Sequence, residues 1–269
     1  MVSYTGIFTG ESMKQYHLLL LALFFSQISY SQTPEEKGLE IAQKIDKANK
    51  GFIGEESTSN LILIDAHGAK VVRKMRGMTM ETTDGNKSIS EFLSPADVKG
   101  TKMLTWSFNK KKNLQWLYLP SFRRVKKISS SGKSASFMGS EFTYEDIAGQ
   151  QLEKFTYKWI KNISEEGMSL WVWEFKAKGK SGYSKQVVTS YQKYLGAKSI
   201  KYYDKKGVLL KVANFGQYKS HKIGKKILFR AEKIHIKNIQ TRKESILKWS
   251  KRKLGVKFNV REFKKTSLR

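Results

Sequence analysis

The sequence predicts a mainly β protein built on one antiparallel sheet, curled or closed, of about ten to twelve strands. Between Phe52 and Trp249, short β-like runs alternate with turn residues at hairpin spacing. No helical crossover of ten or more residues recurs between these runs, which argues against a doubly wound α/β fold. The 269-residue chain shows no internal repeat and no linker, so we expect a single large domain.

A helix is expected to open this domain at Pro34 and to end near Gly51. Glu35 and Glu36 favour its N-terminus, as the helix dipole predicts. Apolar residues recur at three-residue steps and predict one buried stripe, formed by Leu39, Ala42, Ile45 and Ala48.

Strands are expected wherever apolar and polar residues alternate between turns. The runs are 61–64, 71–80, 103–108, 114–119, 122–128, 155–163, 170–175, 187–194, 199–203, 208–215, 227–236 and 244–249. The segment from Ser129 to Ile147 does not fit a hairpin, because it is long, small and polar with embedded Phe137, Met138 and Phe142. Long loops in compact domains are usually functional, so this one is predicted to be a lid or plug.

The N-terminus has the pattern of a secretory signal peptide. A lysine follows Met13, an apolar run covers 18–25, and small residues precede a cut before Gln32. The run is shorter than the roughly 20 residues that span a bilayer. We expect translation to begin at Met13, removal of residues 1–31, and export of residues 32–269.

Composition excludes several classes of site. Cysteine is absent, which removes disulfides, iron–sulfur clusters and thiol catalysis. Gly132-Lys133-Ser134 fails as a P-loop, because Lys127 stands where the motif needs glycine. His67, His221 and His235 share no metal-ligand spacing, and no G-x-S-x-G motif occurs. We therefore expect no catalytic residue, metal or cofactor.

The net charge of +28 predicts attraction to anionic surfaces. In an exported protein such a surface is a membrane or an acidic partner rather than nucleic acid. Charge is densest from Lys219 to Arg269, where 18 basic residues face three acidic ones. Lys248, Lys251, Arg252 and Lys253 are the candidates for docking, against the alternative of a merely solvated surface.

Aromatic residues on separate strands are either plain core or the lining of a cavity for an apolar ligand. The cavity candidates are Leu104, Trp106, Phe108, Trp116, Tyr118, Trp171 and Trp173.

Three runs resemble the outer-membrane lipoprotein-sorting protein family, the LolA-like periplasmic proteins. They are Pro95–Thr101, Gln115–Val125, which includes Arg123 and Arg124, and Phe137–Ile147. The resemblance covers about Pro34 to Arg269 and implies a half-open antiparallel barrel, LolA/LolB-like, with a lid over its concave face. It also implies a non-enzymatic periplasmic carrier that shields acyl chains of a lipoprotein or another lipid during transfer toward the outer membrane.

The resemblance further implies a monomer that works with an inner-membrane transporter of the resistance-nodulation-division type. Two alternatives stay open at this point. One is a lipid-responsive sensor or regulatory protein of the same fold, and the other is a periplasmic hydrolase whose acids are distant in sequence.

Overall fold

The computed structural model describes residues 1–3 and 32–269, and residues 32–269 form one compact unit. The predicted signal peptide and its start at Met13 lie almost entirely outside the described residues. Among the helices that are described, none combines the length and hydropathy needed to span a bilayer.

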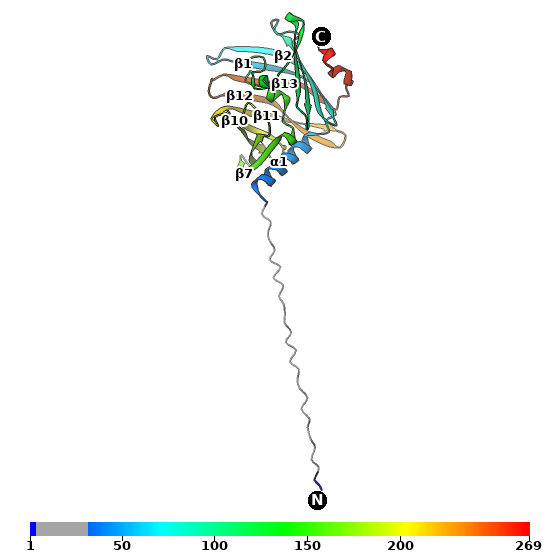
Figure 1. Ribbon diagram of the computed structural model, residues 1–269, viewed down its shortest axis with the longest axis vertical. Coiled ribbons are helices and arrows are strands. Elements are labelled where there is room, and N and C mark those ends of the chain that lie inside the picture. The colour runs from blue at the N-terminus through cyan, green and yellow to red at the C-terminus, as the bar shows by residue number, and fades with distance from the viewer. Residues whose placement is uncertain (4–31) are drawn as a thin grey trace. The chain divides into compact units, whose positions relative to one another are not determined.

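The described chain folds into one antiparallel sheet of 13 strands, slightly more than predicted. Its order is β6-β5-β4-β3-β2-β1-β13-β12-β11-β10-β9-β8-β7, so β6 and β7 are free edges and the sheet stays open. Only β1 and β13 are distant in sequence, and their pairing joins the two halves of the sheet. Figure 1 shows the sheet curving around the segment that contains the short helix α2.

The strands are β1 (Gly54–Ile64), β2 (Lys70–Thr82), β3 (Gly85–Ser94), β4 (Lys102–Phe108), β5 (Leu114–Leu119), β6 (Arg124–Lys127), β7 (Phe155–Glu165), β8 (Met168–Ala177), β9 (Lys185–Tyr191), β10 (Gly196–Tyr203), β11 (Leu209–Ile223), β12 (Lys226–Asn238) and β13 (Glu244–Leu254). The helices are α1 (Pro34–Asn49) and α2 (Tyr144–Ala148). Short 3₁₀ turns are η1 (Pro120–Phe122), η2 (Ser131–Ser134), η3 (Leu152–Lys154), η4 (Val260–Phe263) and η5 (Lys265–Leu268).

The first helix begins with a capping box in which Thr33 and Glu36 satisfy each other's backbone N–H groups. Its buried face differs from the expected stripe, because Gly38, Ile41 and Ala42 are buried whereas Leu39 is 40% exposed. The reason is close packing on β7. A Cβ at Gly38 would lie 2.6 Å from the backbone nitrogen of Lys158, so glycine alone allows this approach.

Apolar side chains gather into three clusters. The largest lies inside the curve of the sheet and contains Phe92, Met103 and Leu117 together with Phe137 and Phe142. The second lies under α1 and contains Trp173 and Phe175. The third is built on the opposite face of β4 and β5, where the C-terminal segment brings Phe263 and Leu268 against the sheet. Figure 1 shows this C-terminal segment, in red, outside the curve of the sheet.

Candidate functional site: a plug inside the curved sheet

The segment from Ser129 to Ala148, here called the plug, fills the inside of the curved sheet. Its centre is a tight hairpin in which Met138 and Gly139 both have positive φ, as a type I′ turn requires. The Phe137 N–H donates to the Phe142 carbonyl oxygen at 2.7 Å and closes the hairpin. The predicted lid or plug segment is therefore a plug, with its apolar side chains directed into the core.

Two aromatic side chains anchor the plug in the sheet. Phe137 is 2% exposed and its ring lies 5.8 Å from that of Phe92 on β3. Phe142 is also buried, and Met138 packs at the edge of the same cluster. All three lid candidates from the sequence thus meet on the concave face. Burying two large aromatic side chains contributes several kcal/mol to plug docking.

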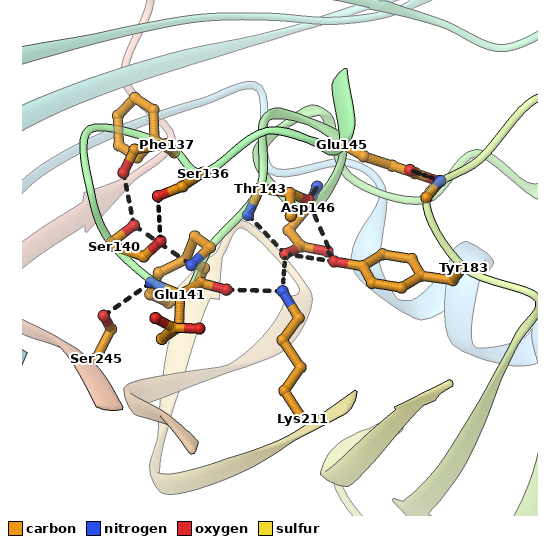
Figure 2. A network of polar contacts seen from close by, with 12 residues as sticks. Ser136, Phe137, Ser140, Glu141, Thr143, Glu145, Asp146, Tyr183, Lys211 and Ser245 are labelled. Carbon is orange, nitrogen blue, oxygen red and sulfur yellow. Dashed lines mark hydrogen bonds and ion pairs between the residues drawn. The ribbon is translucent and has the colours of Figure 1, made fainter. Parts of the chain in front are cut away.

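A buried ion pair fixes the C-terminal half of the plug. Lys211 Nζ on β11 lies 2.7 Å from Asp146 Oδ2 and donates at the same distance to the Glu141 carbonyl oxygen. The two side chains are only 2% and 9% exposed. The Tyr183 hydroxyl donates to Asp146, and the Thr143 N–H donates to the same carboxylate (Figure 2). Every oxygen of this buried carboxylate is therefore satisfied.

Burial and the neighbouring Asp146 charge raise the pKa of Tyr183 far above its ordinary value. Burial likewise raises the pKa of Tyr202, whose ring lies 4.9 Å from Lys211 Nζ. Both phenols therefore stay protonated, and Tyr183 acts here as a hydrogen-bond donor rather than as a base.

Further polar contacts tie the plug to four other strands. The Glu141 N–H donates to Ser245 Oγ of β13 at 3.0 Å (Figure 2). The Glu141 carboxylate accepts from Asn238 of β12 at 2.7 Å. Gln115 on β5 donates to the Tyr144 carbonyl oxygen at 2.8 Å. Arg73 on β2 donates to the carbonyl oxygen of Met138. The plug is thus held by polar contacts to both its backbone and its side chains, in addition to its two buried aromatic rings.

Two cavities lie on either side of the plug, and Phe142 lines both. The first, about 210 Å³, is also lined by Ser57, Met75 and Trp249. The second, about 200 Å³, is lined by apolar residues of β8, β10, β11 and β12, namely Phe175, Ile200, Ala213, Phe215, Ile234 and Ile236. The two cavities and the space that the plug fills are together called the trough. Its lining is mainly apolar on the side of the second cavity and mixed polar and apolar on the side of the first.

The structure divides the predicted cavity residues between two other clusters. Leu104, Trp106, Trp116 and Tyr118 lie in the cluster beneath the C-terminal segment, and Phe108 packs edge-on against Trp106. The Trp106 indole N–H donates to the Phe263 carbonyl oxygen at 2.9 Å. The face of β4 that looks toward the plug instead carries Met103. The expectation that these five residues line the concave face with the plug therefore needs correction.

Trp171 and Trp173 lie in a different cluster from the other five. Both belong to the cluster under α1, and Trp173 is buried with its indole N–H donated to Ser190 Oγ at 2.9 Å. Phe175, two residues further along β8, lines the second cavity. The tryptophans share its face of the sheet, but α1 covers that part of the face.

The basic residues predicted as family-motif or docking residues also lie in different environments. Arg123 and Arg124 are exposed at the turn between β5 and β6. Lys248, Lys251 and Lys253 are exposed on β13. The Arg252 side chain is only 5% exposed and lies 3.2 Å from Glu55 and 3.6 Å from Glu232. Arg252 is thus a structural residue and is withdrawn as a docking candidate.

Comparison with known proteins assigns the chain to a family. A family model described only as an uncharacterized protein matches residues 84–269. A crystal structure described as an outer membrane lipoprotein-sorting protein domain from Vibrio parahaemolyticus is 37% identical, with a TM-score of 0.83, and the match covers 87% of this chain and 99% of that one. The chain belongs to the outer-membrane lipoprotein-sorting protein family, which is LolA-like.

Two other solved structures agree with the family assignment. A DUF1329 family protein from Desulfovibrio piger is 25% identical, with a TM-score of 0.82 over 88% of this chain and all of that chain. A LolA superfamily protein from Nitrosomonas europaea is 17% identical, with a TM-score of 0.67 over 86% of this chain and 98% of that one, and it supports the fold alone. No curated protein matches the sequence.

The three sequence runs that resemble the family all contribute to seating the plug. Val98 from the first run, Leu117 from the second and Phe137 from the third pack in one cluster. The polar anchors outside these runs, Lys211 and Tyr183, were missed by sequence reasoning. A lysine within an otherwise apolar strand was the available signal.

Proposed function

We propose that this protein is a periplasmic carrier that shields acyl chains of a lipoprotein or another lipid during transfer toward the outer membrane. The observation that carries this proposal is the plug, whose Phe137 and Phe142 occupy the concave face between two cavities. Those side chains stand where acyl chains would lie. The lipoprotein-sorting description of the Vibrio relative supports the same reading.

The energetics favour displacement of the plug by a lipid. One buried methylene contributes about 0.8 kcal/mol, so a chain of roughly 15 methylenes contributes on the order of 12 kcal/mol. Two plug aromatics contribute only about 3–6 kcal/mol together. The buried Lys211–Asp146 pair adds about 3–5 kcal/mol to plug docking. Two acyl chains contribute about 24 kcal/mol, so a diacylated or triacylated cargo has enough free energy to move the plug and still bind. Such a carrier makes and breaks no covalent bond.

Export through the predicted signal peptide would place the carrier between the two membranes. An inner-membrane transporter of the resistance-nodulation-division type is the proposed partner for loading, on the family resemblance alone. The carrier is proposed to act as a monomer, because the concave face and its plug belong to a single chain.

Amide hydrogen exchange tests the carrier proposal. Peptides covering 131–148 should exchange faster when the protein is loaded with a dipalmitoylglyceryl lipopeptide, because the plug leaves the sheet. A dibutyryl lipopeptide with the same head is the matched control and should leave exchange unchanged, since its chains are too short to replace the plug. Identical exchange with and without the dipalmitoyl ligand would contradict the proposal.

Docking on anionic membranes is a separate prediction and rests on the three exposed lysines of β13. The variant Lys248→Glu/Lys251→Glu/Lys253→Glu should lose binding to phosphatidylglycerol vesicles at low salt, whereas the wild type should lose it only at high salt. Co-sedimentation with anionic and neutral vesicles measures this. Equal binding of wild type and variant would show that these lysines only solvate the surface.

A further inference from the structure

A basic basin lies beside the plug, near the two free edges of the sheet. It has a volume of about 570 Å³. Seven lysines line it in the described chain: residues 110–112 in the turn between β4 and β5, Lys133 in the plug, Lys154 before β7, and Lys178 and Lys180 after β8. Only two carboxylates, Glu145 and Glu153, share the lining.

The two innermost lysines have no acidic partner at contact distance among the described residues. Lys133 Nζ donates to the Asn113 carbonyl oxygen at 3.1 Å. Lys154 Nζ donates to the Asn113 side-chain oxygen and, at 3.1 Å, to Gln151. Glu145, the nearer acid, accepts instead from Ser181 Oγ and from the Gly182 N–H. Both ammonium groups are half-buried and held only by neutral oxygens.

Electrostatics in the basin are unfavourable without an anion. Burial lowers the pKa of Lys133. Burial, with a contribution from the Lys133 charge, lowers the pKa of Lys154 to about 8. With a pKa of about 8, Lys154 remains mostly protonated at pH 7. A bound anion would relieve this repulsion, and charge-assisted hydrogen bonds from lysine to phosphate are among the stronger ones.

The basin also opens toward the apolar interior. Gly149 and Phe155 line both the basin and the cavity that contains Phe142 and Phe175, and Glu145 borders both. A molecule whose polar head sat among the lysines could therefore pass its chain along Phe155 into the trough. A charged site and an apolar cavity are thus adjacent, as an amphiphile requires.

We propose that this basin binds a phosphate group, and that the carrier therefore binds a lipid with a phosphorylated headgroup more tightly than the same lipid without the phosphate. The second half of this inference rests on the proposed carrier function, whereas the first half does not. Lys133 and Lys154 are the residues that contact the phosphate, and the outer lysines steer it inward.

Calorimetric titration at pH 7 in a phosphate-free buffer tests the proposal with three probes. Lauroyl lysophosphatidate and monolauroylglycerol share chain and glycerol and differ only in the phosphate, and inorganic phosphate probes the head alone. Lysophosphatidate should bind at least about tenfold more tightly than monolauroylglycerol. The variant Lys133→Gln/Lys154→Gln should lose that preference and all binding of inorganic phosphate.

Two further variants control for charge and folding. Lys133→Arg/Lys154→Arg keeps both charges and should keep the preference. Lys219→Gln/Lys222→Gln removes two exposed charges from β11 and should also keep it, which separates a local site from net charge.

The outcomes distinguish failure of the phosphate site from failure of the proposed carrier function. Equal binding of both lipids by wild type and variant would overturn the phosphate site and leave the carrier intact. A second outcome is that inorganic phosphate binds, that the glutamine variant loses this binding, and that lysophosphatidate binds no more tightly than monolauroylglycerol. This outcome would support the anion site and identify free phosphate as its ligand. It would also argue against acyl chains in the trough. No binding of any probe would overturn both.

Discussion

Replacing Lys211 with methionine should lower the free energy of unfolding by about 3–5 kcal/mol. Methionine keeps the length and packing of the side chain but leaves the Asp146 carboxylate buried without its cation. The Tyr183 hydroxyl and the Thr143 N–H still donate to that carboxylate, but neither carries a charge. Urea unfolding followed by circular dichroism measures the effect.

A double variant shows whether the loss comes from the ion pair. In Lys211→Met/Asp146→Asn the charge left behind is gone, and the asparagine oxygen can still accept from Tyr183 and Thr143. The double variant should therefore be more stable than Lys211→Met alone, with a coupling free energy above about 1 kcal/mol. Strict additivity, or a loss below about 1 kcal/mol for Lys211→Met, would show that the pair does not hold the plug.

The fold was predictable from the sequence because its signals are local. Alternation and turn residues marked the strands, and the antiparallel hairpins follow from their spacing. The additional strand is β3, because residues 85–94 were not among the expected strands although they pair with β2 across the turn at Gly85. The half-open shape came from the family resemblance and not from the pattern, since alternation says nothing about whether a sheet closes.

The face of each strand was harder to predict. Alternation places Trp106 and Met103 on opposite faces of β4, but both faces are covered, one by the plug and one by the C-terminal segment. Aromatic bulk therefore could not identify the concave side. The hydrogen bond from Trp106 to Phe263 joins residues 157 positions apart, and no local pattern reveals it.

The buried face of helix α1 could not be predicted from its sequence pattern either. The apolar residue Leu39 seemed to belong to the buried stripe, whereas the close approach of β7 selects the small residue Gly38. The ion pair of Lys211 with Asp146 is also non-local. Its two members look like a strand lysine and a turn aspartate until the plug folds back into the sheet.

Fixing the plug to the sheet should abolish lipid binding. The Glu141 N–H lies 3.0 Å from Ser245 Oγ, so the two residues are neighbours. The pair Glu141→Cys/Ser245→Cys is therefore designed to form a disulfide on oxidation, and mass spectrometry checks that the disulfide has formed. The natural chain has no cysteine, so no competing disulfide can form. When the plug cannot leave, the binding-competent state is removed and affinity should fall by about 100-fold or more.

The matched control is a disulfide that leaves the plug free. Ser164→Cys/Ser169→Cys joins two directly paired residues at the exposed end of the β7–β8 hairpin. This variant should bind lipid equally well when oxidised and when reduced, which excludes an effect of the oxidant itself.

The central claim is that acyl chains take the place of the plug, and the most direct test is the affinity of the Glu141→Cys/Ser245→Cys protein for the dipalmitoylglyceryl lipopeptide before and after reduction. The account predicts almost no binding in the oxidised protein and an affinity at least as high as that of the wild type once dithiothreitol has opened the disulfide, because the two substitutions also remove side-chain contacts that hold the plug. Undiminished binding by the fully oxidised protein would contradict it, because the lipid would then occupy a site that does not require the plug to move.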